Sequence, residues 1–173
     1  MIKYVEKGVK LHQKVAAAGH RMLEVTDAET GKASWVTDDD SAVQSIIDAY
    51  SLDETKAEVI ENMEAKAKEL RDLSIEGVSA AELALRGRKV GEARTYSTTN
   101  DPASAPFLDQ EAQLRGIFLS ALVEKVLRKA DEAAELEAQI AGILGKHKDF
   151  VRMQSSFSAV LSYDFSQGWP VVE

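Results

Sequence analysis

Residues 119–145, which read LSALVEKVLRKADEAAELEAQIAGILG, carry an apolar repeat with alternating steps of three and four residues. The positions of this repeat are Leu119, Leu122, Val126, Lys129, Ala133, Leu136, Ile140 and Ile143. Such steps place side chains on one face of an α-helix, and a repeat lasting about three heptads is typical of a coiled coil. Only Lys129 interrupts the apolar character. We therefore predict a mainly α-helical protein whose long amphipathic helices form a helical bundle or a coiled coil.

The helix that carries this repeat is expected to begin near residues 107–109 and to end at Gly142 or Gly145, because glycine is common just after a helix. Residues 114–127 are apolar in nearly every helical direction, so we expect more than one neighbour to enclose them. A helix of about 35 residues is about 50 Å long, whereas a compact monomer of this size is only about 30–40 Å across. We therefore expect a homo-oligomer or docking on a larger assembly.

A second apolar seam lies earlier in the chain. Ile60, Met63, Ala67 and Leu70 are three, four and three residues apart, and the other faces of this helix carry glutamate and lysine. The preceding residues 51–54, SLDE, match a capping box, in which serine and a glutamate three residues later satisfy each other's backbone amides. This pattern predicts a long amphipathic helix after Ser51.

Two further helix starts are visible in the sequence. Residues 79–82, SAAE, form another capping box, which predicts a short helix to about Arg86. Residues 38–40 are three aspartates that precede apolar side chains at helical spacing between Val43 and Tyr50. Acidic side chains favour helix N-termini, so we interpret the aspartates as a cap. A calcium loop would need a glutamate at a spacing that is missing here.

The first 40 residues predict a small unit with both helix and strand. Apolar residues between Val5 and Val15 leave room for a short helix that Gly19 ends. Residues 22–25, MLEV, and 33–36, ASWV, then flank a turn that contains a glycine, as in a β-hairpin. Two strands are marginally stable alone, so the hairpin needs a helix or a partner chain to pack against.

The clearest loop is predicted at residues 95–106, TYSTTNDPASAP, which contain two of the three prolines of the chain. We therefore divide the chain into a small α+β unit (1–40), an amphipathic helical connector (41–94), this loop (95–106), and a helical C-terminal domain with an aromatic tail (107–173).

Composition restricts the possible functions. A net charge of −8 argues against broad binding to nucleic acid, which requires clustered lysine and arginine. The chain has no cysteine, which excludes disulfides and cysteine-based zinc sites. No apolar run is long enough to predict a membrane span.

Candidate chemical groups point away from catalysis. His12, His20 and His147 do not have the spacing of metal ligands and are interpreted as surface side chains. The basic clusters at residues 86–89 and 146–148 are interpreted as solvated helix ends, since aromatic residues do not alternate with them. We therefore expect a protein that is not an enzyme and that uses no metal, cofactor, small-molecule substrate or nucleic acid.

The chain closes on a dense aromatic segment, residues 162–170, SYDFSQGWP. Aromatic rings bury a large area in few residues, so this tail suits a lock that closes its own bundle or docks on a neighbour. Together with the two seams it supplies the predicted contact residues. These are Ile60, Met63, Leu70, Leu119, Leu122, Val126, Leu136, Ile140, Ile143, Tyr163, Phe165 and Trp169.

Four segments carry a resemblance to a known group of proteins. They are WVTDD at residues 35–39, AVQSIIDAY at 42–50, the charged KAKELRD at 66–72, and YDFSQGWP at 163–170. This layout resembles small proteins encoded among the tail and tail-fibre genes of tailed bacteriophages and prophages.

The resemblance implies a non-enzymatic protein of the virion tail, made in the host cytoplasm, whose partners are further copies of itself or other phage tail proteins. Tail-fibre assembly chaperones likewise combine a β-rich front, a helical middle and an aromatic-proline ending. This chain has a small β portion and a longer helical half, so a structural tail or baseplate role comes first and the chaperone second.

Overall fold

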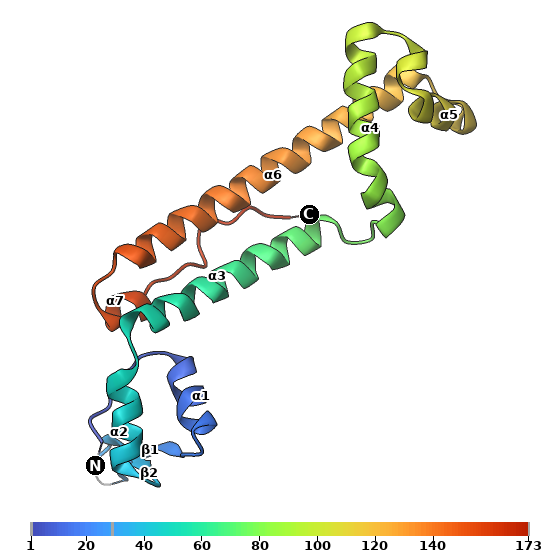
Figure 1. Cartoon of the computed structure of the whole chain (residues 1–173). Coiled ribbons are helices and arrows are strands. Elements are labelled where there is room, and N and C mark those ends of the chain that lie inside the picture. Colours follow the sequence, from blue (N-terminus) through green and yellow to red (C-terminus); the bar gives the residue numbers. More distant parts are fainter. Residues whose placement is uncertain (1, 29, 173) are drawn as a thin grey trace. The chain divides into compact units, whose positions relative to one another are not determined.

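The structure, a computed structural model, describes residues 2–28 and 30–172. It is mainly α-helical with one two-stranded antiparallel hairpin near the N-terminus, as predicted (Figure 1). The elements are α1 (Val9–Ala17), β1 (Met22–Thr26), β2 (Ala33–Thr37), α2 (Asp40–Ala49), α3 (Leu52–Ser74), α4 (Ala80–Thr99), the 3-10 helix η1 (Pro102–Ser104), α5 (Pro106–Arg115), α6 (Leu119–Met153) and α7 (Phe157–Leu161).

The chain divides into two compact units, each built from separate stretches of sequence. One unit comprises the chain up to Lys66 together with Leu144–Gly168. The other comprises Ala67–Ile143 and the residues from Trp169 onward. Helices α3 and α6 contribute residues to both units. The four segments predicted from the sequence, by contrast, are each one continuous stretch of chain.

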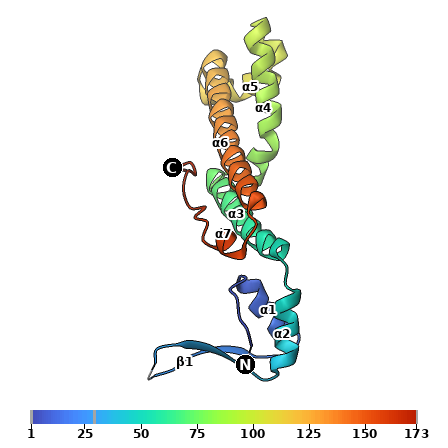
Figure 2. The ribbon, with the colours of Figure 1, turned by 90° about the vertical axis from the view of Figure 1, so that its left-hand side faces the viewer.

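In the first unit, the hairpin packs one face on helices α1 and α2 (Figure 2). Strand β1 pairs with β2 so that Leu23 lies opposite Val36. Alternate residues of a strand point to opposite faces. Trp35 packs against the core, with its ring 4.3 Å from that of Tyr4, whereas Leu23, Val25 and Val36 are exposed.

The core beneath the hairpin uses the predicted helical spacing. Val43, Ile47 and Tyr50 of the α2 segment are buried together with Leu11 and Val15 of α1. The predicted aspartate cap is also confirmed. A carboxylate oxygen of the residue before α2 accepts hydrogen bonds at 3.0 Å from two backbone amides of its first turn.

The same unit has a second core, between the first part of α3, the last part of α6, and α7. Val59, Met63, Val151 and Val160 are buried there. The two long helices are also joined by polar contacts, because Lys56 Nζ donates to the carbonyl of residue 152 and residues 64 and 148 form an ion pair. The seam predicted on α3 therefore packs inside its own chain.

In the second unit, α4, η1, α5 and the start of α6 enclose a separate core. Its buried side chains are Ala93, Ala105, Leu108, Ala112, Leu122 and Val123. The N-terminus of α5 has no local side-chain cap. The Glu92 carboxylate of α4 serves instead, accepting hydrogen bonds from the backbone amides of Phe107 and Leu108 at 2.9 and 3.1 Å.

Three expected helix boundaries were wrong. The long helix does not start near residues 107–109, because α5 ends at Gly116 in a left-handed conformation (φ 65°) and α6 begins afresh at Leu119. It also does not end at Gly142 or Gly145, since α6 continues through both to Met153. The packing of flanking residues outweighs the modest helical cost of glycine.

The helix predicted to stop near Arg86 also runs further. Helix α4 reaches Thr99 and ends at Asn100, whose φ of 53° is left-handed. The loop predicted at residues 95–106 is therefore shorter and begins at Asn100. Threonines have low intrinsic helix propensity, but here their hydroxyls bond to carbonyls one turn earlier, as Thr95 does to that of Gly91.

Candidate protein-binding site

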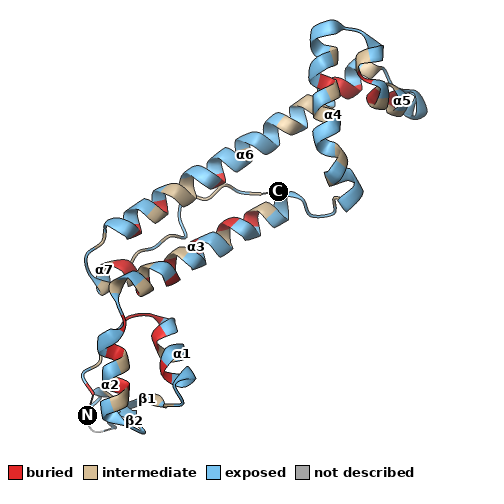
Figure 3. Ribbon diagram, viewed as in Figure 1, coloured by how far each residue is buried: buried red, intermediate tan, exposed pale blue. Residues whose placement is uncertain are grey.

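The predicted repeat on α6 is covered by its own chain at both ends and open in the middle. Leu122 and Ile140 are only 2% and 1% exposed. Leu119 and Ile143 are half-buried, as are Val126 and Leu136, whereas Lys129 and Ala133 between them are exposed (Figure 3).

This open part of α6 forms the floor of a cavity of about 300 Å³ in the second unit. The apolar part of its lining is Val90 of α4 and Leu122, Val126, Ala130 and Ala133 of α6. A neighbouring cavity of about 800 Å³ continues along α6 past Leu136 and Ile140. The two share four lining residues, Glu82, Arg86, Lys129 and Ala133, so we call them together the α6 groove.

The first cavity has a basic rim. Its cations are Arg86 and Lys89 of α4, Arg115 of α5, and Lys125 and Lys129 of α6. Its carboxylates are Glu82 and Glu111. Lys89 and Arg115 both pair with Glu111 at 2.8 Å, and the Lys89 hydrogen bond in particular lowers the pKa of the Glu111 carboxyl.

The other cations of the rim have no carboxylate partner among the described residues. Within residues 2–28 and 30–172, neither Arg86, Lys125 nor Lys129 makes an ion pair or a side-chain hydrogen bond. The expectation that residues 86–89 lie at a helix end was wrong, because they lie within α4, where Arg86 and Lys89 line the cavity.

An exposed apolar corner lies where α5 meets α6. Leu114 and Phe118 are 82% and 84% exposed, and Ile117 between them is also exposed. The expectation that neighbours enclose residues 114–127 therefore fails for this part within the described chain. These side chains flank the break at Gly116 and are not part of the core that holds Leu122.

The other predicted contact residues lie mostly inside the protein. Met63 and Leu70 are buried and Ile60 is half-buried. Tyr163 and Phe165 pack against the α3–α6–α7 core of the first unit, and Trp169, in the second unit, is half-buried. The aromatic tail thus contributes to both units.

His147 contradicts the expectation of a surface histidine, since it is only 5% exposed. Its Nδ1 lies 2.6 Å from the Tyr163 hydroxyl, and its Nε2 lies 3.1 Å from the Gln167 carbonyl oxygen. The ring of Tyr163 also stacks on Phe150 at 4.1 Å between centroids. These contacts fasten the chain after α7 to α6, so we assign His147 a structural role.

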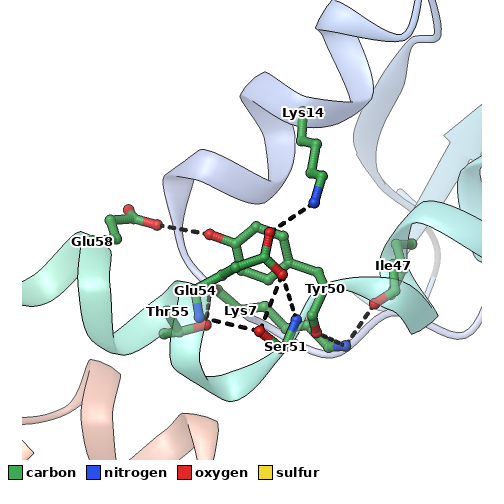
Figure 4. Close-up of polar contacts among 8 residues, drawn as sticks. All are labelled: Lys7, Lys14, Ile47, Tyr50, Ser51, Glu54, Thr55 and Glu58. Carbon is green, nitrogen blue, oxygen red and sulfur yellow. Dashed lines mark hydrogen bonds and ion pairs between the residues drawn. The ribbon is translucent and has the colours of Figure 1, made fainter.

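A buried polar cluster in the first unit is likewise structural (Figure 4). Lys7 Nζ donates to the carbonyls of Ile47 and Tyr50 at 2.6 and 2.8 Å, and the Thr55 hydroxyl donates to the carbonyl of Lys7 at 2.7 Å. The Glu58 carboxylate accepts from the Tyr50 hydroxyl at 3.5 Å. Burial and the nearby Glu58 charge raise the pKa of Tyr50 to about 12. Each polar group named here has a hydrogen-bond partner within the described chain, which compensates for the burial of these groups.

Across residues 2–28 and 30–172, no three histidine or carboxylate side chains gather as a metal ion requires. None of the helices described is both long and apolar enough to cross a bilayer.

Comparisons with known proteins give no family assignment. No protein-family model, curated protein or solved structure matches the chain.

Sequence reasoning found the floor of the groove but missed its rim. The spacing of residues 119–143 placed Val126, Ala133 and Leu136 on one face. The cations of α4 and α5 come from sequence positions far from α6, and only the packing of three helices brings them together. The one available signal was the basic cluster at residues 86–89.

Proposed function

We propose that this protein is a non-enzymatic structural component of a bacteriophage tail, baseplate or tail-fibre assembly, located in the virion and acting through protein–protein contacts. The resemblance of its layout to phage tail-region proteins supplies the context. The exposed apolar corner at Leu114, Ile117 and Phe118 is the observation that supports the mode of action.

Soluble proteins rarely leave large apolar side chains fully exposed in a group, and such groups commonly mark interfaces. Burying one Leu or Phe side chain is worth about 1.5–3 kcal/mol. The corner also lies at a defined turn, because Gly116 holds the left-handed conformation that ends α5. A partner would therefore meet a preformed surface.

The test uses the phage or prophage that encodes the chain. Intact particles carrying wild-type protein are purified and analysed by mass spectrometry, beside particles made with the double variant Leu114→Ser and Phe118→Ser. We expect wild-type protein in the particles and loss of the double variant. Ser120→Glu, an exposed polar site close by, is the control and should be retained.

Circular dichroism of each purified variant checks that folding is intact, since neither replaced side chain belongs to a buried core. If the wild-type protein is absent from particles and is instead recovered from the lysate bound to tail fibres, it is an assembly chaperone and not a structural component. Retention of the double variant would remove the apolar corner as the contact.

A further inference from the structure

We propose that the α6 groove binds an amphipathic helix of a partner protein, with acidic side chains of that helix over the basic rim formed by Arg86, Lys125 and Lys129. This inference rests on the proposed function, namely that the chain works by binding other polypeptides, and it adds the chemistry of one partner.

The floor of the groove has the spacing that a helix recognises. Val126, Ala133 and Leu136 belong to the alternating three- and four-residue steps with which one helix packs along another. Ala130 and Ala133 are small, so the floor is hollow between its larger side chains and leaves room for leucine-sized side chains. From Val126 to Leu136 the floor is about 15 Å long, which matches about three turns of a partner helix.

The rim fixes the charge of that helix. Five cations and two carboxylates line the first cavity, within a chain whose net charge is −8. Glu111 is engaged by Lys89 and Arg115, which leaves Arg86, Lys125 and Lys129 as cations without an ionic partner in the chain as described. Carboxylates above an apolar floor are therefore the complementary groups.

The charges of the adjoining cavity determine which half of the bound helix lies over each cavity. Its carboxylates, Glu82, Glu132, Glu135 and Glu137, outnumber its cations, Arg71, Arg86 and Lys129. Arg71 already pairs with Glu137 at 2.6 Å, and Glu132 lies 3.7 Å from Arg128. The acidic half of the bound helix therefore lies over Lys125, and its neutral or basic half lies towards Ile140.

Other ligands fit the groove less well. A small anion would satisfy the rim but would leave the apolar floor in water. Single-stranded nucleic acid gains affinity by stacking bases on aromatic rings, and no aromatic residue lines either cavity as described.

The test uses the full-length protein and a synthetic probe. The probe is a fluorescein-labelled peptide of about 15 residues, with leucine at helical three- and four-residue spacing and glutamate on the flanking positions of its first half. A peptide of the same composition in scrambled order is the control. Fluorescence anisotropy titrations are made at about 50 and 300 mM salt, since rim charges are screened by salt.

We expect saturable binding of the patterned peptide, about tenfold tighter than of the scrambled one and weaker at high salt. The double charge reversal Arg86→Glu and Lys129→Glu should weaken this binding at least about tenfold, and a peptide with lysine in place of glutamate should bind that variant better than the wild type. Arg94→Glu changes an exposed arginine of α4 that lines neither cavity, and it should leave binding unchanged.

Equal binding of patterned and scrambled peptides, or binding that ignores the charge reversal, would overturn the proposal. So would a groove that binds inorganic phosphate but not the peptide. A dimer of the wild type that the charge reversal converts to monomer would also overturn it, because a second copy would then occupy the groove. The presence of the protein in virions is measured separately, so either proposal can fail alone.

Discussion

Gly8 shows how a single residue sets the entry to α1. Its φ of 105° and ψ of 169° lie in a region open essentially to glycine alone. The buried Glu58 carboxylate accepts hydrogen bonds from the next two backbone amides, those of Val9 at 2.8 Å and Lys10 at 3.0 Å. A side chain added at Gly8 would place its Cβ 2.5 Å from Glu58 Oε2. Both the backbone and the cap therefore require glycine here.

We predict that Gly8→Ala lowers the free energy of unfolding by at least about 2 kcal/mol, because strained φ and ψ alone cost about 1–3 kcal/mol. Gly19→Ala is the matched control, since Gly19 also has a positive φ but has nothing within 4 Å of an added Cβ. It should cost only about 1–2 kcal/mol. Urea denaturation monitored by circular dichroism measures both free energies of unfolding. Equal losses in the two variants would show that the cap by Glu58 does not restrict this position.

The Glu54 carboxyl gives the same unit a dependence on pH. The hydrogen bond from Lys14 at 2.7 Å, followed by that from the Ser51 backbone amide at 2.8 Å, lowers the pKa of Glu54 to about 2. A carboxyl whose pKa is lower in the folded state than its ordinary 4.5 stabilises the fold above that value. The stabilisation is lost as the pH falls from about 4.5 to about 2.

We therefore predict that Glu54→Gln lowers the thermal midpoint at pH 7 and that the difference from wild type shrinks steadily below pH 4.5. Lys14 and Glu54 are both partly exposed to solvent, which keeps the effect small. Lys14→Met should remove part of the same stabilisation, so the double variant should lose less than the two single losses together. Differential scanning calorimetry between pH 7 and pH 2 measures this. A difference that stays constant with pH would contradict the assignment.

Among the elements, the features predicted best from sequence were helix caps formed by residues close together in the chain. At the start of α3, Ser51 and Glu54 form the expected reciprocal box, with distances of 2.8 and 3.2 Å, and the Ser79 hydroxyl accepts from Glu82 at 3.1 Å. The caps of α1 and α5 were not predicted, because Glu58 and Glu92 reach helices that are distant in the chain. Such caps follow from packing and leave no local pattern.

Gly116 and Gly145, of which the first lies within the expected long helix and the second at its expected end, make a test at this scale. Gly145 lies within α6 and nothing lies within 4 Å of an added Cβ, whereas Gly116 ends α5 with φ of 65°. Gly145→Ala should stabilise the protein by about 0.5–1 kcal/mol, because alanine is the better helix former. Gly116→Ala should destabilise it by about 1–2 kcal/mol. Urea denaturation measures both, and the same sign for both would contradict the helix boundaries.

For the whole molecule, the mainly helical class with a hairpin could be predicted from sequence, whereas the grouping into units could not. Periodicity identifies which face of a helix is apolar but not which helix covers it. Val126 and Leu136 illustrate this, because the same repeat that is buried at Leu122 and Ile140 is open between them. The α6 groove is open because α4 and α5 cover only one end of that repeat, which only the assembled unit reveals.

The chain offers a direct measurement of how independently its two units unfold, because Trp35 lies in the first and Trp169 in the second. Trp169→Phe and Trp35→Phe each leave one fluorescent reporter. Leu11 and Leu108 are fully buried in cores of different units that share no residue, and replacing either by alanine should cost about 2–5 kcal/mol. We predict that Leu11→Ala lowers the urea midpoint reported by Trp35 more than that reported by Trp169, and that Leu108→Ala does the reverse. Midpoints that move together in both variants would mean that α3 and α6, which run through both units, join them into one cooperative transition.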